Sequence, residues 1–210
     1  YQPKYLSTVE ALRELGAIPL QEVAKPAKRK FSPAAGQPFS YIEISDIDTS
    51  TGVINATTLL GEEAPDRAQW VVRKGDVIVS TVRPIRNAVA LISEDEDGFV
   101  CSSGFAVLKA EAVAAELLFA FLKTKAIAEL LDRQTKATMY PAVTWQDVLN
   151  IPILKPDEGL EQFVQEIAVL VQQSYQASRM ARALLEEAKA KVEALIEGAA
   201  EAPPRGKGQG

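Results

Sequence analysis

A long stretch without helix breakers, near the C-terminal end, constrains the fold of this chain most. From Gly159 to Glu197 the sequence has no proline and no further glycine, and strong helix formers fill most of it. At 1.5 Å per residue, this stretch predicts a helix about 55–60 Å long. Because the rest of the chain should form a narrower body, we expect part of this helix to project.

One face of the predicted helix is apolar. Residues in steps of three and four fall on one line, which we call the helix seam, and all except Ser174 and Lys191 are apolar: Phe163, Ile167, Leu170, Ser174, Ala177, Ala181, Leu184, Ala188, Lys191 and Leu195. This spacing is typical of a coiled coil. Since the chain offers no second helix of similar length, the seam indicates a partner helix. The alternative is a helix folded along its own domain.

Composition excludes several classes of function. The 210 residues include no histidine and one cysteine, Cys101, so the chain lacks the commonest general base, a zinc cluster and an internal disulfide. It also lacks a glycine-rich phosphate loop and the Asn/Asp-Pro-Pro-Tyr motif of adenine methylation. We therefore predict a protein that is not an enzyme and binds no metal or cofactor. No membrane-span pattern or signal peptide is visible, so we expect a cytoplasmic protein.

Short strands precede the long helix. Alternating or buried-type apolar patterns occur at residues 39–47, 76–82, 88–92 and 99–108, with turn residues between them. From residue 112 to 133 the apolar period becomes helical. We predict an α+β fold, with a mostly antiparallel, curled or barrel-like sheet, flanking helices and one long C-terminal coiled-coil-like helix.

The pattern divides the chain into four parts. Residues 1–17 predict an entry helix, which a capping box at Ser7 and Glu10 begins and Gly16 ends. Residues 18–157 form the body, 158–197 the long helix, and the low-complexity residues 198–210 a disordered tail. Because the sequence begins at Tyr1 rather than methionine, we expect a piece of a longer protein.

Basic residues gather in three segments, although the net charge is −5. The first is a predicted loop at residues 24–37, the second is the loop from Arg83 to Asn87, and the third includes Lys136. An acidic total argues mildly against bulk binding of nucleic acid, but a local basic surface can still contact phosphates. Solvated surface loops are the alternative for each segment.

Four segments, in this order, resemble the DNA specificity (S) subunits of Type I restriction–modification systems. They are YIEISDIDTSTGVI from Tyr41, GDVIVSTVRPIRNAVALI followed by SSGFAVLK from Gly75, ATMYPAVTWQDVLNIPILKP from Ala137, and LEQFVQEI from Leu160. The first three are similar to parts of the family's target recognition domain. The fourth is similar to the start of its spacer helix, including the pair Glu161-Gln162.

The resemblance implies that the chain directs other subunits to a DNA site. S subunits usually carry two recognition domains and two antiparallel spacer helices, whereas this sequence has one of each. Residues 18–157 would read a half-site in the major groove of double-stranded DNA. A partner adenine-N6 methyltransferase, and a restriction subunit where present, would supply the chemistry of DNA methylation and defence. The helix would pair with a second copy, with the other half of a longer chain, or with the methylase subunit.

Physical chemistry suggests roles for individual residues. Arginine is the best bidentate donor to guanine and asparagine suits adenine, whereas lysines and arginines also hold phosphates. We predict base contacts by Arg83, Arg86 and Asn87, phosphate contacts by Lys28, Arg29, Lys30 and Lys136, and base or sugar contacts by Thr138 and Tyr140. Arg83 has a structural alternative, because it belongs to the STVRP pattern itself.

Two other classes of protein compete with this hypothesis. One is an assembly protein that acts through its long helix and binds no DNA. The other is a catalytic fragment of a nuclease or a methylase. A specificity fragment of a methylase–specificity fusion enzyme is a further possibility. A metal nuclease would need clustered carboxylates, but the pattern splits Glu43, Asp46 and Asp48 between a strand and a turn. Catalysis by this chain is therefore not predicted.

Overall fold

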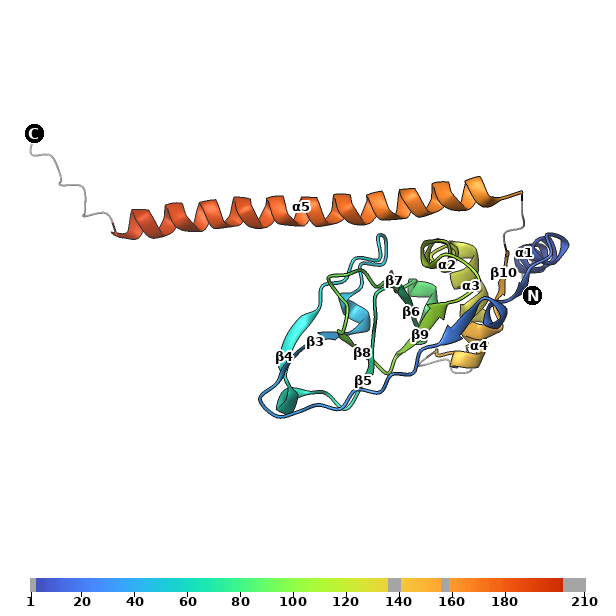
Figure 1. The fold of residues 1–210 in the computed structure, drawn as a ribbon, viewed down its shortest axis with the longest axis horizontal. Helices are drawn as coiled ribbons and strands as arrows, with labels where there is room; N and C mark the ends of the chain where they lie inside the picture. Colours follow the sequence, from blue (N-terminus) through green and yellow to red (C-terminus); the bar gives the residue numbers. More distant parts are fainter. Residues whose placement is uncertain (1–2, 136–140, 156–158, 202–210) are drawn as a thin grey trace, which may run out of the picture. The chain divides into compact units, whose positions relative to one another are not determined.

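The fold is that of a computed structural model, which describes residues 3–135, 141–155 and 159–201 (Figure 1). The chain divides into two units, one ending at Val171 and the other beginning at Gln172. The first unit contains all strands and helices α1 to α4, and the long helix α5 (Glu161–Glu201) begins in it. The predicted α+β class and the long C-terminal helix are confirmed.

One four-stranded sheet forms the best buried part of the first unit. Its strands are β2 (Ala24–Pro26), β9 (Phe105–Ala110), β6 (Asp76–Ser80) and β7 (Val89–Leu91), and they pair antiparallel in that order. Every residue of β6 is buried, as expected for an apolar run in the middle of a sheet. The predicted strand at 76–82 is thus the centre of the sheet, although it ends at Ser80.

A second sheet of four strands contains one parallel pair. The order is β4-β3-β8-β5, and β3 pairs parallel with β8 whereas its pairing with β4 is antiparallel. A separate two-stranded sheet joins the start of the body to its end. The two four-stranded sheets stay open in the described residues and do not close into a barrel. The bounds are β1 (Ile18–Pro19), β3 (Pro38–Ile42), β4 (Thr57–Leu60), β5 (Ala68–Val71), β8 (Val100–Ser102) and β10 (Pro152–Ile153).

Short helices complete the first unit. They are α1 (Pro3–Glu14), η1 (Leu20–Glu22), η2 (Ile44–Asp46), η3 (Gly61–Glu63), η4 (Pro84–Arg86), α2 (Ala115–Leu122), α3 (Lys125–Arg133) and α4 (Trp145–Leu149). Helix α4 begins with a capping box, in which Thr144 and Asp147 each accept a hydrogen bond from the other's backbone N–H. No helix of the described chain is long and apolar enough to cross a membrane.

Several predicted boundaries differ from the structure. Helix α1 begins at Pro3 rather than at Ser7, because proline fits the first helical turn. The strand predicted over residues 39–47 ends at Ile42, because the Asp46 carboxylate accepts a hydrogen bond from the Glu43 N–H and starts a helical turn. The predicted basic loop at 24–37 begins as strand β2, which pairs with β9 at the edge of its sheet.

The two larger sheets share one hydrophobic core. Ile42 and Cys101 of the second sheet pack in the same buried cluster as Ile78, Phe105 and Val107 of the first. Burial raises the pKa of the Cys101 thiol far above its usual range, so this cysteine is an apolar core residue rather than a reactive thiolate.

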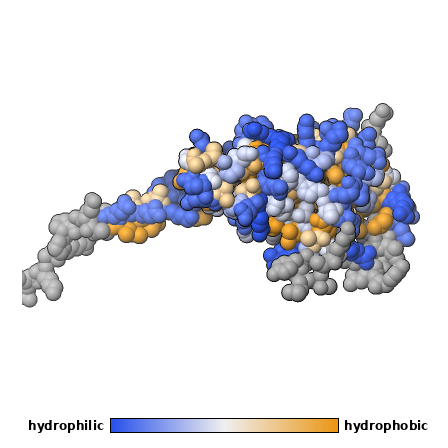
Figure 2. All heavy atoms as spheres, turned by 90° about the horizontal axis from the view of Figure 1, so that it is seen from below, coloured by the Kyte–Doolittle hydropathy of each residue, from blue (hydrophilic) through white to orange (hydrophobic). Residues whose placement is uncertain are grey.

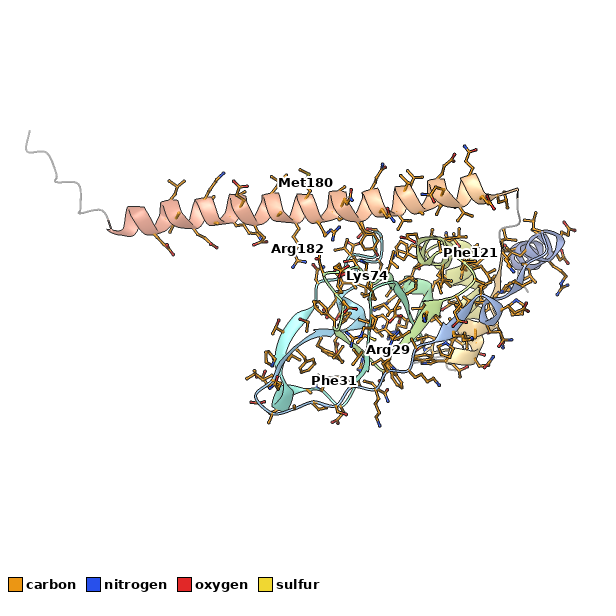
Figure 3. The ribbon with its side chains drawn as sticks, viewed as in Figure 1. Arg29, Phe31, Lys74, Phe121, Met180 and Arg182 are labelled. Carbon is orange, nitrogen blue, oxygen red and sulfur yellow. The ribbon has the colours of Figure 1, made fainter. Side chains whose placement is uncertain are left out.

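A buried ion pair links the sheets on one side of this core. Nη1 and Nη2 of Arg29 donate to the two carboxylate oxygens of Asp76 at 2.6 and 3.1 Å. Asp76 begins β6 and is 1% exposed. The backbone oxygen of Arg29 accepts from Val71 N of β5 at 2.7 Å, and Figure 3 shows Arg29 between the two sheets. The residue therefore ties β6 of the first sheet to β5 of the second.

The substitution Asp76→Asn should lower the free energy of unfolding by about 3 kcal/mol. It removes the carboxylate but keeps the side-chain shape, so the Arg29 guanidinium loses its charged partner. Because the Arg29 side chain is 35% exposed, the loss should fall at the lower end of the range for broken buried pairs. Equilibrium denaturation by urea measures the change.

The matched control is Glu94→Gln, which removes the exposed carboxylate that pairs with Lys74. It should change the free energy of unfolding by less than about 1 kcal/mol, as is usual for surface pairs. Equal effects of the two substitutions would mean that the Arg29–Asp76 pair does not join the sheets in the way described.

Candidate nucleic-acid interface

The loop from Arg83 to Asn87 connects the paired strands β6 and β7, and it has an unusual backbone. Both end residues are left-handed, with φ of 48° at Arg83 and 57° at Asn87, and helix η4 lies between them. No other non-glycine residue of the described chain has a positive φ. Side chains with a Cβ adopt this conformation only where surrounding contacts impose it, often at functional sites. The loop is therefore held in one shape by its neighbours.

Backbone contacts fix the entrance of the 83–87 loop. The N–H of Arg83 donates to Pro141 O at 2.8 Å, and Val82 pairs with Ala142 in an isolated bridge. Side-chain contacts fix its exit, because Nδ2 of Asn87 donates to Lys123 O at 2.6 Å. Nζ of Lys123 donates in return to Asn87 O at 3.1 Å.

The tip of the loop presents a cation and an apolar side chain to solvent. Arg86 is exposed and Ile85 is 48% exposed, whereas Pro84 is buried beneath them. A guanidinium can donate two hydrogen bonds to guanine, and an apolar side chain can contact the methyl group of thymine. Ile85 is not among the contacts predicted from the sequence. The available signal was a large apolar residue between two arginines in a loop.

Asn87 and Arg83 are placed differently from Arg86. The Asn87 amide faces inward, and its Oδ1 is buried without a hydrogen-bond partner in the described chain. We therefore assign Asn87 to holding the loop, and the predicted adenine contact does not fit its position. Arg83 is half-buried at the left-handed entrance, so its structural alternative has gained support.

The first basic segment divides into outward and inward residues. Lys28 and Lys30 are exposed, and Nζ of Lys28 lies 5.2 Å from the ring centroid of Trp145. Arg29, between them, is partly exposed, and its guanidinium binds the buried Asp76. The Asp76 carboxylate offsets the charge of the Arg29 guanidinium, so a phosphate contact by Arg29 has less support than one by Lys28 or Lys30 and stays a prediction.

The segment from Pro141 to Trp145 connects the 83–87 loop with the basic segment that contains Lys28 and Lys30. The backbone oxygen of Pro141 accepts the hydrogen bond from the Arg83 N–H, and the ammonium group of Lys28 lies over the ring of Trp145. Four residues span at most about 14 Å, so the Cα atoms of Pro141 and Trp145 cannot be farther apart. The predicted contacts of Lys136, Thr138 and Tyr140 lie outside the described residues.

Three other basic side chains of the body lie beside carboxylates. Lys25 lies 2.6 Å from Glu111, and Arg73 lies 3.2 Å from Asp97. Lys74 pairs with Glu94 in the same acidic turn. These pairs lower the net positive charge at their positions. Among the predicted contacts in the described residues, Lys28, Lys30 and Arg86 are exposed.

The carboxylates near residue 45 are occupied by local backbone contacts. Asp46 accepts from the Glu43 N–H, and Asp48 accepts from the N–H groups of Ser50 and Thr51. The hydrogen bonds from Ser50 and Thr51 hold the pKa of Asp48 well below its usual range. Within the described residues there is no group of three or more cysteine, aspartate or glutamate side chains that could hold a metal ion.

Helix α5 exposes most of its predicted seam. Phe163, Leu170, Leu184 and Leu195 are between 56% and 73% exposed, and Ala177 and Ala181 are exposed as well. Figure 2 shows apolar side chains along one side of the C-terminal part of the helix and polar side chains along the other. Burying such a face is the main way in which helices of this type gain stability.

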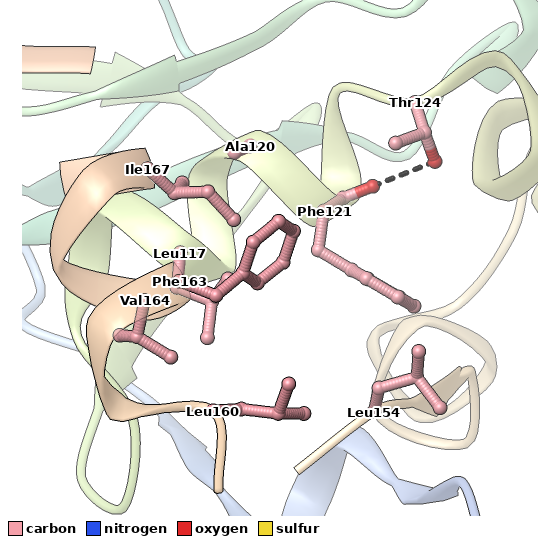
Figure 4. Close-up of a pocket in the computed structure, with 9 residues that line it drawn as sticks. All are labelled: Leu117, Ala120, Phe121, Thr124, Leu154, Leu160, Phe163, Val164 and Ile167. Atoms are coloured by element: carbon pink, nitrogen blue, oxygen red, sulfur yellow. Dashed lines mark hydrogen bonds between the residues drawn. The ribbon is translucent and has the colours of Figure 1, made fainter. Parts of the chain in front are cut away.

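The first turns of α5 pack around an apolar pocket in the first unit (Figure 4). The pocket has a volume of about 260 Å³. Two residues of the seam, Phe163 and Ile167, line it opposite helix α2, whose Leu117 and Phe121 form part of the wall. The start of the seam is thus partly covered by the body, and the exposed ring of Phe163 leaves the pocket open.

The known proteins that this chain is similar to come from Type I restriction–modification systems. No family model matches the chain. The specificity subunit of the Type I restriction enzyme HindI from Haemophilus influenzae is 26% identical over 110 residues, which cover 50% of this chain and 24% of that subunit. The chain therefore spans about a quarter of this curated relative.

Two solved structures share the fold over most of the chain. The HsdS subunit of Thermoanaerobacter tengcongensis is 35% identical with a TM-score of 0.64, and the match covers 92% of this chain and 50% of that one. A chain from a structure of the assembly and conformational transition of the type I R-M system is 34% identical with a TM-score of 0.66, covering 92% and 51%. In sequence and fold this chain is therefore similar to the specificity subunits of Type I restriction–modification systems, and it spans about half the length of the two solved chains.

Proposed function

We propose that this chain is a DNA sequence-specificity module that reads one half-site of double-stranded DNA. The observation that carries the proposal is the 83–87 loop, whose backbone is fixed at both ends and whose exposed tip carries Ile85 and Arg86. A fixed loop loses little conformational entropy on binding, which favours selective contacts.

The contacts divide into specificity and position. Arg86 would donate to O6 and N7 of a guanine in the major groove, and Ile85 would contact a neighbouring thymine methyl group. Lys28 and Lys30 would bind phosphates, which set the position of the protein on the duplex without selecting sequence. The short connection through Pro141 to Trp145 allows both sets of contacts on one duplex.

The chemistry would belong to other subunits. The module would direct an adenine-N6 methyltransferase subunit, and a restriction subunit where present, to the recognised site. It would not be catalytic itself. This division is supported by the similarity to specificity subunits and by the local engagement of the carboxylates near residue 45.

The long helix would pair with a second helix of the same kind. That helix belongs either to a second copy of this chain or to the other half of a longer chain, and the half-length match to the solved relatives supports both arrangements. The exposed seam and the small residues Ala177 and Ala181 allow close approach. Two paired modules would then read two half-sites at a fixed separation.

An assembly protein that binds no DNA is the second candidate, and the exposed seam favours it. The two candidates differ in the dependence of DNA affinity on salt. Phosphate contacts make affinity fall steeply as salt rises, whereas an assembly protein would show weak, non-selective retention of DNA or none.

Arg86→Ala should weaken binding to the selected half-site by roughly 1–3 kcal/mol and leave binding to unrelated duplexes almost unchanged. A randomised duplex pool first identifies the selected sequence, and fluorescence titration then gives both affinities. Arg182→Ala is the control, because it removes the same charge from an exposed position on α5.

Two other outcomes of the Arg86 experiment have clear meanings. An equal loss on every duplex would make Arg86 a phosphate contact rather than a base contact. If the native chain enriches no sequence from the pool, the proposed specificity function is wrong.

A double substitution, Leu170→Glu with Leu184→Glu, should abolish self-association if α5 pairs with a second copy. Each glutamate places a charge in an interface that would otherwise be apolar, which is costly unless the charge is paired. Light scattering over a concentration series measures the mass. Gln165→Glu with Gln176→Glu adds the same charge on the opposite side of the helix and should leave the mass unchanged.

A native chain that stays monomeric at every concentration would contradict pairing with a second copy. The seam would then be expected to bind a helix from a different chain.

A further inference from the structure

Lys123 follows helix α2 directly and points its ammonium group at three backbone carbonyls. Nζ lies 3.1 Å from Asn87 O, 3.2 Å from Val89 O and 3.5 Å from Asp48 O. These acceptors belong to the end of the 83–87 loop, to strand β7 and to the turn after residue 47. One side chain thus connects three segments that are distant in sequence.

Lys123 and Asn87 bind each other in both directions. The Asn87 side chain donates to Lys123 O at 2.6 Å, and the Lys123 side chain donates to Asn87 O. Asn87 is the left-handed residue that ends the loop, with φ of 57°. Because both contacts converge on that residue, they stabilise the backbone conformation that sets the direction of Ile85 and Arg86.

Apolar packing alone would not require an ammonium group at this position. Burial lowers the pKa of Lys123 from 10.5 to about 8, so keeping its ammonium group charged at this position costs free energy. The charged group that acts on it is the Asp48 carboxylate, and β7 and the loop contribute carbonyl oxygens. A methionine would fill the same space without this cost, but it would supply no directed hydrogen bonds.

We propose that Lys123 is a positioning residue for sequence recognition: it contacts no DNA and acts by holding the 83–87 loop through Asn87. The inference rests on the proposed function of that loop. If so, selection of the bases that Ile85 and Arg86 contact depends on Lys123, although Lys123 itself does not reach the DNA.

Lys123→Met should therefore relax sequence selection without abolishing DNA binding. Among duplexes selected from a randomised pool, we expect about a tenfold loss of discrimination at the base positions that Arg86→Ala also changes. Lys125→Met is the matched control. It also removes one lysine charge, two residues further along the chain, but the Lys125 side chain is 81% exposed. Binding to unrelated duplexes should change equally in the two variants.

Asn87→Gly provides a second test, since glycine accepts the left-handed backbone but lacks the amide. It should relax selection at the same base positions, and it decides the question if Lys123→Met does not fold, as judged by circular dichroism.

The dependence on pH separates positioning from general stability. The pKa of Lys123 is lower in the folded chain than in the unfolded chain, so its contribution to stability rises as pH increases from about 8 to 10.5. Over the same range the neutral amine keeps only two N–H donors for three carbonyls. From about pH 7 to about pH 9, discrimination by the native chain should fall while its stability does not, and the Lys123→Met profile should stay flat.

Three results would overturn the inference. Lys123→Met and Asn87→Gly could keep the native selection, which would reject positioning but leave the proposed function intact. The native pH profile could match that of Lys123→Met, with the same consequence. Absence of any selected sequence for the native chain would reject the proposed function, and the role of Lys123 in recognition with it.

Discussion

The bidentate contact between Arg29 and Asp76 joins the two larger sheets, and the arrangement of the body depends on it. Asp76 begins the central strand β6, while the backbone of Arg29 binds β5 of the second sheet. A carboxylate with 1% exposure requires such a partner, because an unpaired buried charge is very costly. The same requirement holds the Arg29 guanidinium on Asp76, although its side chain stays 35% exposed, whereas Lys28 and Lys30 are exposed.

The 83–87 loop shows how a fixed frame can present variable side chains. Its ends are held by Pro141 and Lys123, and these contacts involve backbone groups or the inward Asn87 amide. The exposed Ile85 and Arg86 take no part in these contacts. A loop of this kind allows its tip residues to change without altering the backbone that orients them, which suits a protein whose proposed task is to distinguish DNA sequences.

Helix α5 gives the proposed module its need for a partner. A helix of 41 residues with an exposed apolar face gains little stability alone, because helices in proteins depend mainly on packing. The chain spans about half of the solved specificity subunits that it resembles. The exposed seam and the half-length match therefore support the same proposal from independent observations, namely that a second helix completes the assembly.

The sequence by itself determined the elements that local periodicity and capping specify. It predicted the long helix, the buried strand β6 and the α+β class, because these depend on residues close together in the chain. Only the tertiary structure decided which polar side chains face inward. Arg29 meets Asp76 across 47 residues, and Asn87 meets Lys123 across 36, so no local pattern could separate them from the exposed Lys28 and Arg86. Burial of a charge or an amide depends on partners that folding brings together from distant parts of the chain.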